Sequence, residues 1–317
     1  MEPNETVLSD VHVFAPFLKI ENSDTALTRF VIKQPKQNNE KDVDHGSINT
    51  VMKDDEGDFV VDRGIKYDNE PCDVIIIEHQ LATVLKDVGL QVWRGALLLA
   101  DYLLENEDMF AGCYGLELGA GVGLCSVVLG RVASAVFCTD FGDDVLRNCH
   151  KNAEMNAHLY KNTSVNKDEG QVSPVVKVRE LDWTKGIILS STSNGMEECY
   201  RWSKTDTDEL KKVTVFFAAD VIYDDKLTDA LFNQVLHLLQ QNQQATFYLS
   251  IEKRLNFTME DLDVVCPAYK YYLQTIQRLQ TKKILHVKQI PTTFTQFFNY
   301  ERVKELELWE MKAHGPE

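Results

Sequence analysis

The chain has 317 residues, 44% of them hydrophobic and 26% charged, which is typical of a globular protein with enough core to fold alone. Its formal net charge of −16 disfavours direct binding to nucleic-acid phosphates and favours a partner with a basic surface. No apolar run approaches the ~18 to 20 residues of a membrane span, and no basic segment of a signal peptide opens the chain, so we expect an intracellular protein, nuclear or cytoplasmic, without membrane contact. The 7 cysteines form no C-x-x-C pair, so we expect neither a disulfide framework nor a zinc site.

Residues 1–73 predict a β-rich extension of the main domain. Short patches of β-branched and aromatic residues at 11–14, 29–32 and 58–61 are typical of short strands, and we expect them to form an appended hairpin. Residues 34–55, between two of these patches, have almost no apolar side chains. Because burial there cannot offset the entropy lost on ordering, we expect a mobile loop.

Residues 74–317 predict a second domain, in which apolar strands alternate with amphipathic helices. Strands are expected at 114–118, 135–140, 175–181, 213–222 and 245–251, helices at 95–105, 122–132, 143–157, 227–238 and 267–280, and a final antiparallel hairpin at 284–290 and 305–311. These alternations predict an α/β fold with a doubly wound, Rossmann-like sheet of seven strands. Two polar insertions, at about 161–173 and 184–212, are expected to be surface loops.

A glycine-rich run, Glu117-Leu118-Gly119-Ala120-Gly121-Val122-Gly123, lies where the first of these strands ends and a helix begins. Glycines there let the backbone approach a ligand closely, and the helix start offers free N–H donors, although such a run can also be a simple packing turn. A dinucleotide site would need glycine at Leu124, so that reading is disfavoured. Glu117, placed just before the glycines, suits a cationic ligand better than a phosphate.

Acidic residues follow the next three strands. Asp140 closes the second strand, where it can accept both hydroxyl groups of a ribose or serve only as a helix cap. Asp182 and Trp183 end the third strand, where they offer a carboxylate to an adenine amino group and a flat ring beside it, or only packing. Asp220 follows an apolar run, where a buried charge is costly, so we expect it to face a ligand crevice.

Two aromatic residues flank these acids in the predicted fold. Trp93 precedes the first helix of the sheet domain, where it can lie against a cofactor or in the core. Tyr223 follows Asp220 by three positions and can line the crevice or stand only at its rim. The sequence leaves both alternatives open.

Taken together, these motifs resemble the S-adenosylmethionine-dependent methyltransferases of the seven-strand class, and more narrowly the methyltransferase-like protein-lysine methyltransferases. The shared pattern is a Trp before a long apolar helix, E-L-G-x-G-x-G, an acid after strand two, L-D-W after strand three and D-x-x-Y after strand four. The similarity runs from about Val74 to the C-terminus. It implies a methyltransferase sheet, S-adenosyl-L-methionine as cofactor and no metal. It also implies methyl transfer to the side-chain amine of an accessible lysine in a non-histone protein, with molecular chaperones as further partners. The acidity of the chain adds the expectation that this lysine lies in a basic region.

Carried over by position, the resemblance also implies roles for individual residues. Asp220 and Tyr223 would form the catalytic pair, in which Asp220 captures and aims the amine and Tyr223 lines the lysine channel. Water would carry the proton away. The implied cofactor contacts are Trp93, Glu117, Gly119, Ala120, Gly121, Asp140, Asp182, Trp183 and Ala219.

Alternative functions remain open at this stage. The chain can be a catalytically silent S-adenosylmethionine-binding scaffold, or a methyltransferase acting on a nucleic acid or a small molecule. Nucleic-acid amine methyltransferases typically carry two prolines where this chain has Val221 and Ile222. Arginine methylation would need paired glutamates after strand four, whereas Glu197 and Glu198 come before it. Because the N-terminal region and the insertions depart from the compact family pattern, the resemblance does not identify the substrate protein.

Overall fold

The computed structural model describes residues 6–9, 11, 17–20, 24–32, 52–53, 59–60, 73–161, 164–165, 172–185, 198–254, 256–258 and 263–314. The predicted mobile loop at 34–55 lies outside the described residues except for 52–53, and the insertion at 161–173 lies mostly outside them. The domain boundaries proposed from the sequence therefore stay predictions.

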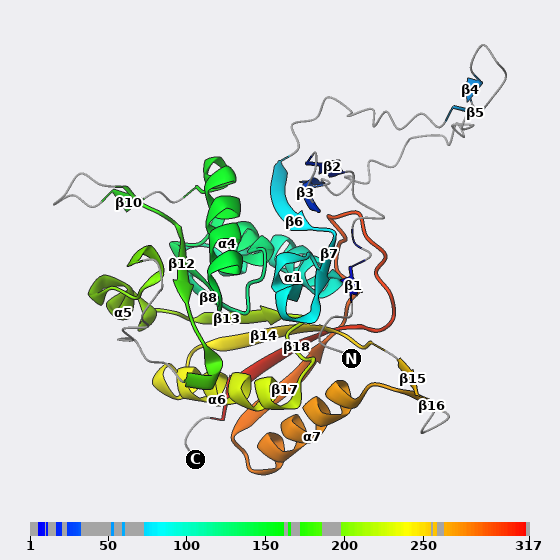
Figure 1. The fold of residues 1–317 in the computed structure, drawn as a ribbon. Helices are drawn as coiled ribbons and strands as arrows, with labels where there is room; N and C mark the ends of the chain where they lie inside the picture. Colours follow the sequence, from blue (N-terminus) through cyan, green and yellow to red (C-terminus); the bar gives the residue numbers. More distant parts are fainter. Residues whose placement is uncertain are drawn as a thin grey trace, which may run out of the picture.

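A seven-stranded sheet forms the centre of the molecule, as the sequence predicts (Figure 1). The first five strands in its order are parallel, and the last two form an antiparallel hairpin on β14. Because the chain order reverses between β8 and β13, ligand-binding residues are expected beyond the carboxyl ends of these strands. The spatial order is β12 (Val176–Glu180), β9 (Ala135–Asp140), β8 (Tyr114–Leu118), β13 (Val215–Ala219), β14 (Thr246–Glu252), β18 (Leu306–Ala313) and β17 (Leu285–Ile290).

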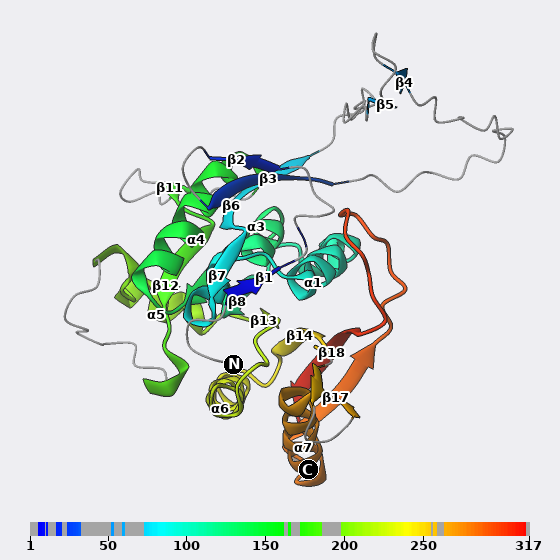
Figure 2. The ribbon, with the colours of Figure 1, turned by 45° about the vertical axis from the view of Figure 1, so that its right-hand side comes forward.

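Helices cover both faces of the sheet, which explains why its central strands are apolar on both sides (Figure 2). One face packs against α1 (Arg94–Glu105), α3 (Leu124–Gly130) and α4 (Asp143–Met155). The other packs against α6 (Asp225–Gln241) and α7 (Pro267–Thr281). Shorter helical segments are α2 (Glu107–Phe110), η2 (Leu85–Leu90), η3 (Ala157–Leu159) and η4 (Trp183–Lys185).

The N-terminal strands form more than the predicted hairpin. β2 (Phe17–Lys19), β3 (Thr25–Val31) and β6 (Val74–Gln80) make a three-stranded antiparallel sheet, and β1 (Thr6–Leu8) pairs with β7 (Ala82–Val84). The pairing of β3 with β6 crosses the predicted boundary at residue 73. The described strands further include β4 (Met52–Lys53), β5 (Phe59–Val60), β10 (Ser164–Val165), β11 (Val172–Ser173), β15 (Asn256–Thr258) and β16 (Asp263–Val265).

Asn152 of α4 and Asn156, the residue directly after this helix, attach this N-terminal sheet to the main domain. The Asn156 side chain accepts a hydrogen bond from the Ile76 amide at 2.9 Å, and the Asn152 side chain accepts one from the Glu78 amide at 2.8 Å. Both side-chain amides also donate to carbonyl groups of the same β6 residues. Each asparagine therefore satisfies backbone groups of β6 that would otherwise need another strand.

The end of the second insertion is not a surface loop, so that prediction is wrong for residues 198–212. This stretch contains η5 (Glu198–Tyr200) and α5 (Lys204–Leu210), and Trp202 packs on Phe137 with 5.0 Å between ring centroids. Its Nε1 donates to the Glu180 carbonyl at 2.7 Å. Residues 186–197 lie outside the described ranges.

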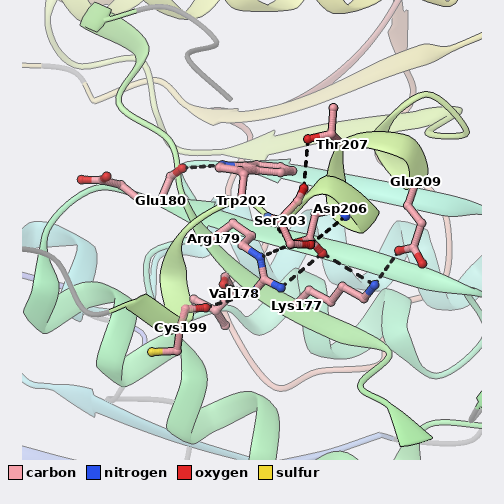
Figure 3. A network of polar contacts seen from close by, with 10 residues as sticks. All are labelled: Lys177, Val178, Arg179, Glu180, Cys199, Trp202, Ser203, Asp206, Thr207 and Glu209. Carbon is pink, nitrogen blue, oxygen red and sulfur yellow. Dashed lines mark hydrogen bonds and ion pairs between the residues drawn. The ribbon is translucent and has the colours of Figure 1, made fainter. Parts of the chain in front are cut away.

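Ion pairs explain how such a polar stretch can pack on the edge strand β12 (Figure 3). Arg179 donates to both carboxylate oxygens of Asp206, at 2.8 and 3.2 Å, and Lys177 lies 2.5 Å from Glu209. The Ser203 and Asp206 side chains also form a reciprocal cap at the start of α5. The polar composition of this stretch indicated solvent exposure because the charges of Asp206 and Glu209 are paired with residues of β12 that are distant in sequence.

We predict that Asp206→Ala destabilises the protein by about 3–5 kcal/mol, because it leaves the buried Lys177 and Arg179 charges underpaired. Asp208→Ala is the matched control on the same helix, where an exposed pair with Lys211 contributes about 0–1 kcal/mol. Chemical denaturation measures both changes. Equal losses in the two variants would contradict an anchoring role for Asp206.

The same carboxyl should make stability sensitive to acid. Burial alone would raise the pKa of Asp206, but hydrogen bonds from Arg179 and Ser203 outweigh burial and lower it. The stabilisation is therefore present above the ordinary Asp pKa of about 3.8 and is lost as the pH falls through the lower folded-state pKa.

Candidate active site

A cleft of about 340 Å³ opens beyond the carboxyl ends of the parallel strands, where β8 and β13 lie side by side. This is the position at which an open α/β sheet commonly binds its ligand. All the site residues predicted from the sequence lie along its walls: Trp93, Glu117, Gly119, Ala120, Gly121, Asp140, Asp182, Trp183, Ala219, Asp220 and Tyr223. The geometry brings them together, while their individual roles remain predictions.

The glycine-rich turn forms the floor of the cleft with backbone that requires glycine. Gly119 and Gly121 have φ values of 72° and 54°, in the left-handed region that other residues rarely adopt. A Cβ on Gly119 would lie 3.0 Å from the Trp183 ring, and one on Gly121 would lie 2.9 Å from the Gly89 carbonyl oxygen. Side chains at these positions would close the cleft, so the turn is built for close approach.

Asp140 holds this turn from the neighbouring strand. Its Oδ2 accepts a hydrogen bond from the Gly121 amide at 2.7 Å, and its Oδ1 accepts one from the Phe141 amide at 2.6 Å. Burial raises the pKa of Asp140 despite these bonds. Since each carboxylate oxygen can accept more than one hydrogen bond, the residue can support the turn and still bind two hydroxyl groups.

Glu117 lies beneath the turn and is only 2% exposed. Its Oε2 accepts hydrogen bonds from the Ser126 amide at 2.9 Å and from the Ser126 hydroxyl at 2.5 Å. Burial raises the pKa of Glu117 to about 8. The residue is thus mainly protonated at neutral pH, whereas the sequence argument treated it as a simple anion.

Asp182 and Trp183 form the opposite wall. Asp182 accepts hydrogen bonds from the Thr184 amide and hydroxyl at 2.9 and 2.6 Å, and Lys185 lies 3.1 Å away. Burial opposes ionisation of Asp182, but these partners outweigh it and lower the pKa. Within the described residues, the buried indole Nε1 of Trp183 has no hydrogen-bond partner. The wall therefore offers a flat ring beside the glycine turn, which fits an aromatic ligand group.

Asp220 is held more tightly than the sequence indicated. Its Oδ2 accepts a hydrogen bond from the Gly95 amide and its Oδ1 accepts one from the Glu252 amide, both at 2.8 Å. A Cβ on Gly95 would lie 2.6 Å from the Asp220 Cγ, so this contact requires glycine. Asp220 itself has φ 54° and a side chain only 2% exposed. It borders the cleft as predicted, but it also joins the start of α1 to the end of β14.

Tyr223 stands at the rim of the cleft and is 47% exposed. Desolvation, together with the negative charges of Asp140 and Asp224, raises the pKa of Tyr223 to about 12. The phenol therefore stays protonated near neutral pH. It can donate a hydrogen bond or present its ring, but it is poorly suited to act as a base.

Sequence reasoning missed one whole wall of the cleft and several further lining residues. The missed wall comes from η2 and the residues after it, including Lys86, Val88 and Gly89. Six residues of tight helical turn carry no motif, so only the three-dimensional packing reveals them. Phe141, 54% exposed, also lines the cleft, and its position directly after Asp140 could have indicated it.

Trp93 connects this missed wall to its surroundings. Its Nε1 donates to the Val88 carbonyl at 3.0 Å, and the Arg254 guanidinium lies 4.2 Å from the centre of its ring.

No described helix has the length and apolar content to cross a membrane. Nor do the described residues include a group of three or more His, Cys, Asp or Glu side chains able to hold a metal ion.

Comparisons with known proteins agree with this geometry. The chain is 41% identical over 268 residues to methyltransferase-like protein 22 of Mus musculus, covering 83% of this chain and 64% of that protein. It is 42% identical over 256 residues to the Homo sapiens protein of the same name, covering 79% of this chain and 60% of that protein. The chain thus spans less than two thirds of the length of these relatives.

A more distant relative is the protein-lysine N-methyltransferase EFM3 of Chaetomium thermophilum, 24% identical over 201 residues, or 62% of this chain and 52% of that protein. A family model described as lysine methyltransferase matches residues 72–278. That match covers more than half of the chain and includes every residue that lines the cleft. The protein therefore belongs to the lysine methyltransferase family, whose cofactor is S-adenosylmethionine.

Proposed function

We propose that this protein transfers a methyl group from S-adenosylmethionine to the side-chain amine of a lysine in a non-histone protein. The observation that supports this most directly is the presence of Asp220 and Tyr223 on the same cleft as the glycine turn. The names of the relatives point the same way, since one of them is a protein-lysine N-methyltransferase. When bound, the cofactor supplies a methyl group activated by a sulfonium.

The residues predicted as cofactor contacts can be given separate tasks. Gly119, Ala120 and Gly121 would cradle the cofactor with backbone groups, and Asp140 would accept the ribose hydroxyls. Asp182 would bind the adenine amino group, with Trp183 beside the ring. Glu117, Trp93 and Ala219 would complete the walls. The lack of room for side chains at the two glycines supports this assignment.

Substrate deprotonation is the main chemical obstacle. A lysine of pKa about 10.4 is neutral in roughly one molecule in a few thousand at pH 7, which corresponds to about 5 kcal/mol. Desolvation and a nearby positive charge both lower that pKa. Asp220 would attract and aim the amine, and the hydrogen bonds from two backbone amides hold its carboxylate in place. Because Tyr223 has a pKa of about 12, it would orient the amine while water removes the proton.

The substrate and partners follow from charge and resemblance alone. A net charge of −16 favours a substrate lysine within a basic region. Molecular chaperones are proposed as partners on the strength of the family resemblance, and the nucleus or cytoplasm as the compartment.

Incubation with labelled cofactor and a cell lysate, followed by mass spectrometry, tests the activity. Methyl-lysine in a protein supports the proposal, label in nucleic acid or a small molecule contradicts it, and bound cofactor without any transfer indicates a scaffold.

Asp140→Ala should weaken cofactor binding by about 1.5–3 kcal/mol, the range for hydrogen bonds to a charged acceptor. Titration calorimetry measures this loss as a roughly ten- to hundredfold increase in Kd. Asp144→Ala provides the control, because Asp144 lies nearby at the start of α4 but is exposed and does not line the cleft. An unchanged Kd for Asp140→Ala would rule out the ribose assignment.

Asp220 requires two substitutions to separate structure from catalysis. Asp220→Ala should cost about 2–4 kcal/mol of stability, because the Gly95 and Glu252 amides lose their acceptor. Asp220→Asn tolerates the left-handed backbone and keeps one acceptor, so it should fold and bind cofactor while losing most transfer. Melting temperature, cofactor Kd and turnover are compared. Normal turnover by Asp220→Asn would exclude a role for the charge in capturing the amine.

Glu117 is expected to release a proton when the cofactor binds. Its pKa of about 8 keeps it protonated at pH 7, and a neighbouring positive charge would favour the carboxylate. Calorimetry in buffers of different ionisation enthalpy should detect up to about one released proton in the wild type. Glu117→Gln should release almost none. The same proton release in both proteins would show that another group titrates.

Glu117 also predicts how the stability of the cofactor-free protein varies with pH. Because its pKa is raised from 4.5 to about 8 by folding, its contribution to stability is fully present below pH 4.5. That contribution is lost progressively as the pH rises toward 8, since the unfolded chain gives up the proton first. Thermal melts of Glu117→Gln should therefore lack this decline.

A further inference from the structure

One wall of the cleft is a segment with no catalytic motif. It runs from η2 to Trp93 and lines the cleft through residues that include Val88, Gly89 and Gln91. A Cβ on Gly121 would lie 2.9 Å from the Gly89 carbonyl oxygen, so this wall rests directly on the glycine turn. Any outward movement of the wall would widen the cleft beside Gly121.

A single buried amide ties this wall to the N-terminal strand. Gln91 is only 2% exposed, and its Oε1 accepts a hydrogen bond from the Ser9 amide at 2.7 Å. Its Nε2 donates to the Val7 carbonyl at 2.9 Å and to the Thr83 hydroxyl at 2.7 Å. Gln91 therefore bonds to β1, to β7 and to the residue after β1, all with its side chain.

A second contact strengthens the same connection. The Ser9 hydroxyl donates to the carbonyl of Val92, the residue directly before Trp93. Trp93 in turn donates to the Val88 carbonyl at 3.0 Å, which closes the wall on itself. The chain segments joined in this way are more than 80 residues apart in sequence. Local sequence cannot hold them together, so the side-chain bonds carry the attachment.

The strands in this attachment are too short to hold by themselves. β1 and β7 have three residues each and form a separate two-stranded sheet. Isolated two-stranded pairs are at best marginally stable in water. Removing the Gln91 amide would also take the acceptor from the amide of buried Ser9 and one donor from the Val7 carbonyl. The wall would then be free to leave the glycine turn.

We propose that Gln91 and Ser9 are positioning residues for the cofactor. Through them, the N-terminal strand holds this wall of the cleft at the distance from the glycine turn that cofactor binding requires. Gln91 itself borders the cleft, but its amide is bonded to Ser9, Val7 and Thr83. It therefore acts through the other residues of the wall, such as Gly89 and Trp93, and needs no contact with the reacting atoms. This inference rests on the assignment of the cleft to S-adenosylmethionine. It assigns to residues 6–9, which lie outside the segment matched by the family, a share of the cofactor affinity.

Gln91→Met tests the proposal, because it preserves the approximate shape of the side chain and removes the hydrogen bonds. If the wall then keeps its position in about one molecule in ten, the Kd for S-adenosylmethionine rises about tenfold. Titration calorimetry measures the Kd and thermal melting the stability. Hydrogen exchange of residues 85–92 should become faster in the variant.

Asn156→Leu is the matched control. Asn156 is also a fully buried amide that anchors an N-terminal strand, but its bonds go to Ile76, and it does not line the cleft. Both variants should lower the melting temperature, whereas only Gln91→Met should weaken cofactor binding. Equal Kd values for wild type and Gln91→Met, or equal weakening by Asn156→Leu, would overturn the proposal.

Ser9→Ala keeps the test decisive if Gln91→Met fails to fold. It removes the hydroxyl bond to Val92 and a long bond accepted from the Val11 amide at 3.4 Å, but it leaves the bonds of the Gln91 amide in place. A smaller increase in Kd is therefore expected, and an unchanged Kd would count against the proposal. Asp140→Ala separates this inference from the cleft assignment. If Asp140→Ala weakens binding and the Gln91 and Ser9 variants do not, the positioning role is wrong. If Asp140→Ala has no effect either, the cleft assignment is wrong.

Discussion

The need to satisfy free backbone N–H groups at the carboxyl edge of the parallel sheet determines the structure of the site. Helices and turns begin there, and their first amides have no partner within the helix. Each strand-end acid meets this need: Glu117 bonds to the amide of Ser126, and Asp220 bonds to the amides of Gly95 and Glu252. Asp140 and Asp182 accept backbone amides in the same way. The acids are therefore structural whether or not a ligand is present.

One carboxylate can both cap a turn and bind a ligand. The sequence offers these two roles for Asp140 as alternatives, but a carboxylate has enough acceptor capacity for both. Amides that fix a carboxylate in advance reduce the cost of ordering it when a ligand arrives. The strained backbone of Asp220, at φ 54°, fits the same pattern, because such conformations persist where surrounding contacts impose them. Fold stability and ligand binding thus share the same side chains.

The sequence predicted the sheet well because its signals are local. The strands Tyr114–Leu118 and Ala135–Asp140 are apolar runs that end at a glycine or an acid, and the structure reproduces their bounds. Helix α3 begins at Leu124, later than expected, because Gly121 and Gly123 adopt positive φ. All the predicted site residues lie on one cleft because each stands at the end of a strand, shortly after one, or just before a helix, at the same edge of the sheet.

Features that depend on distant contacts could not be predicted in the same way. The polar residues of α5 look exposed until Arg179 and Lys177 of β12 are seen to neutralise them. Likewise, the wall formed by η2 is defined by the bonds of Gln91 to Val7 and Ser9, which no period or motif records. Sequence reasoning therefore found residues that line the cleft and missed the bonds that attach η2 to the N-terminal strand.

The two regions that depart from the compact family pattern are attached to opposite walls of the cleft. The N-terminal strand β1 bonds to the wall that contains Gly89, while the second insertion leaves the sheet directly after Trp183 and returns at η5 and α5. The ion pairs of Asp206 fix that return on β12, the strand whose end supplies Asp182 and Trp183. Because interiors transmit displacement through packed contacts, changes in either region should reach the cofactor before they reach the rest of the fold. The added segments thus support the walls of the cleft from outside, and of their described residues only Thr184 lines it.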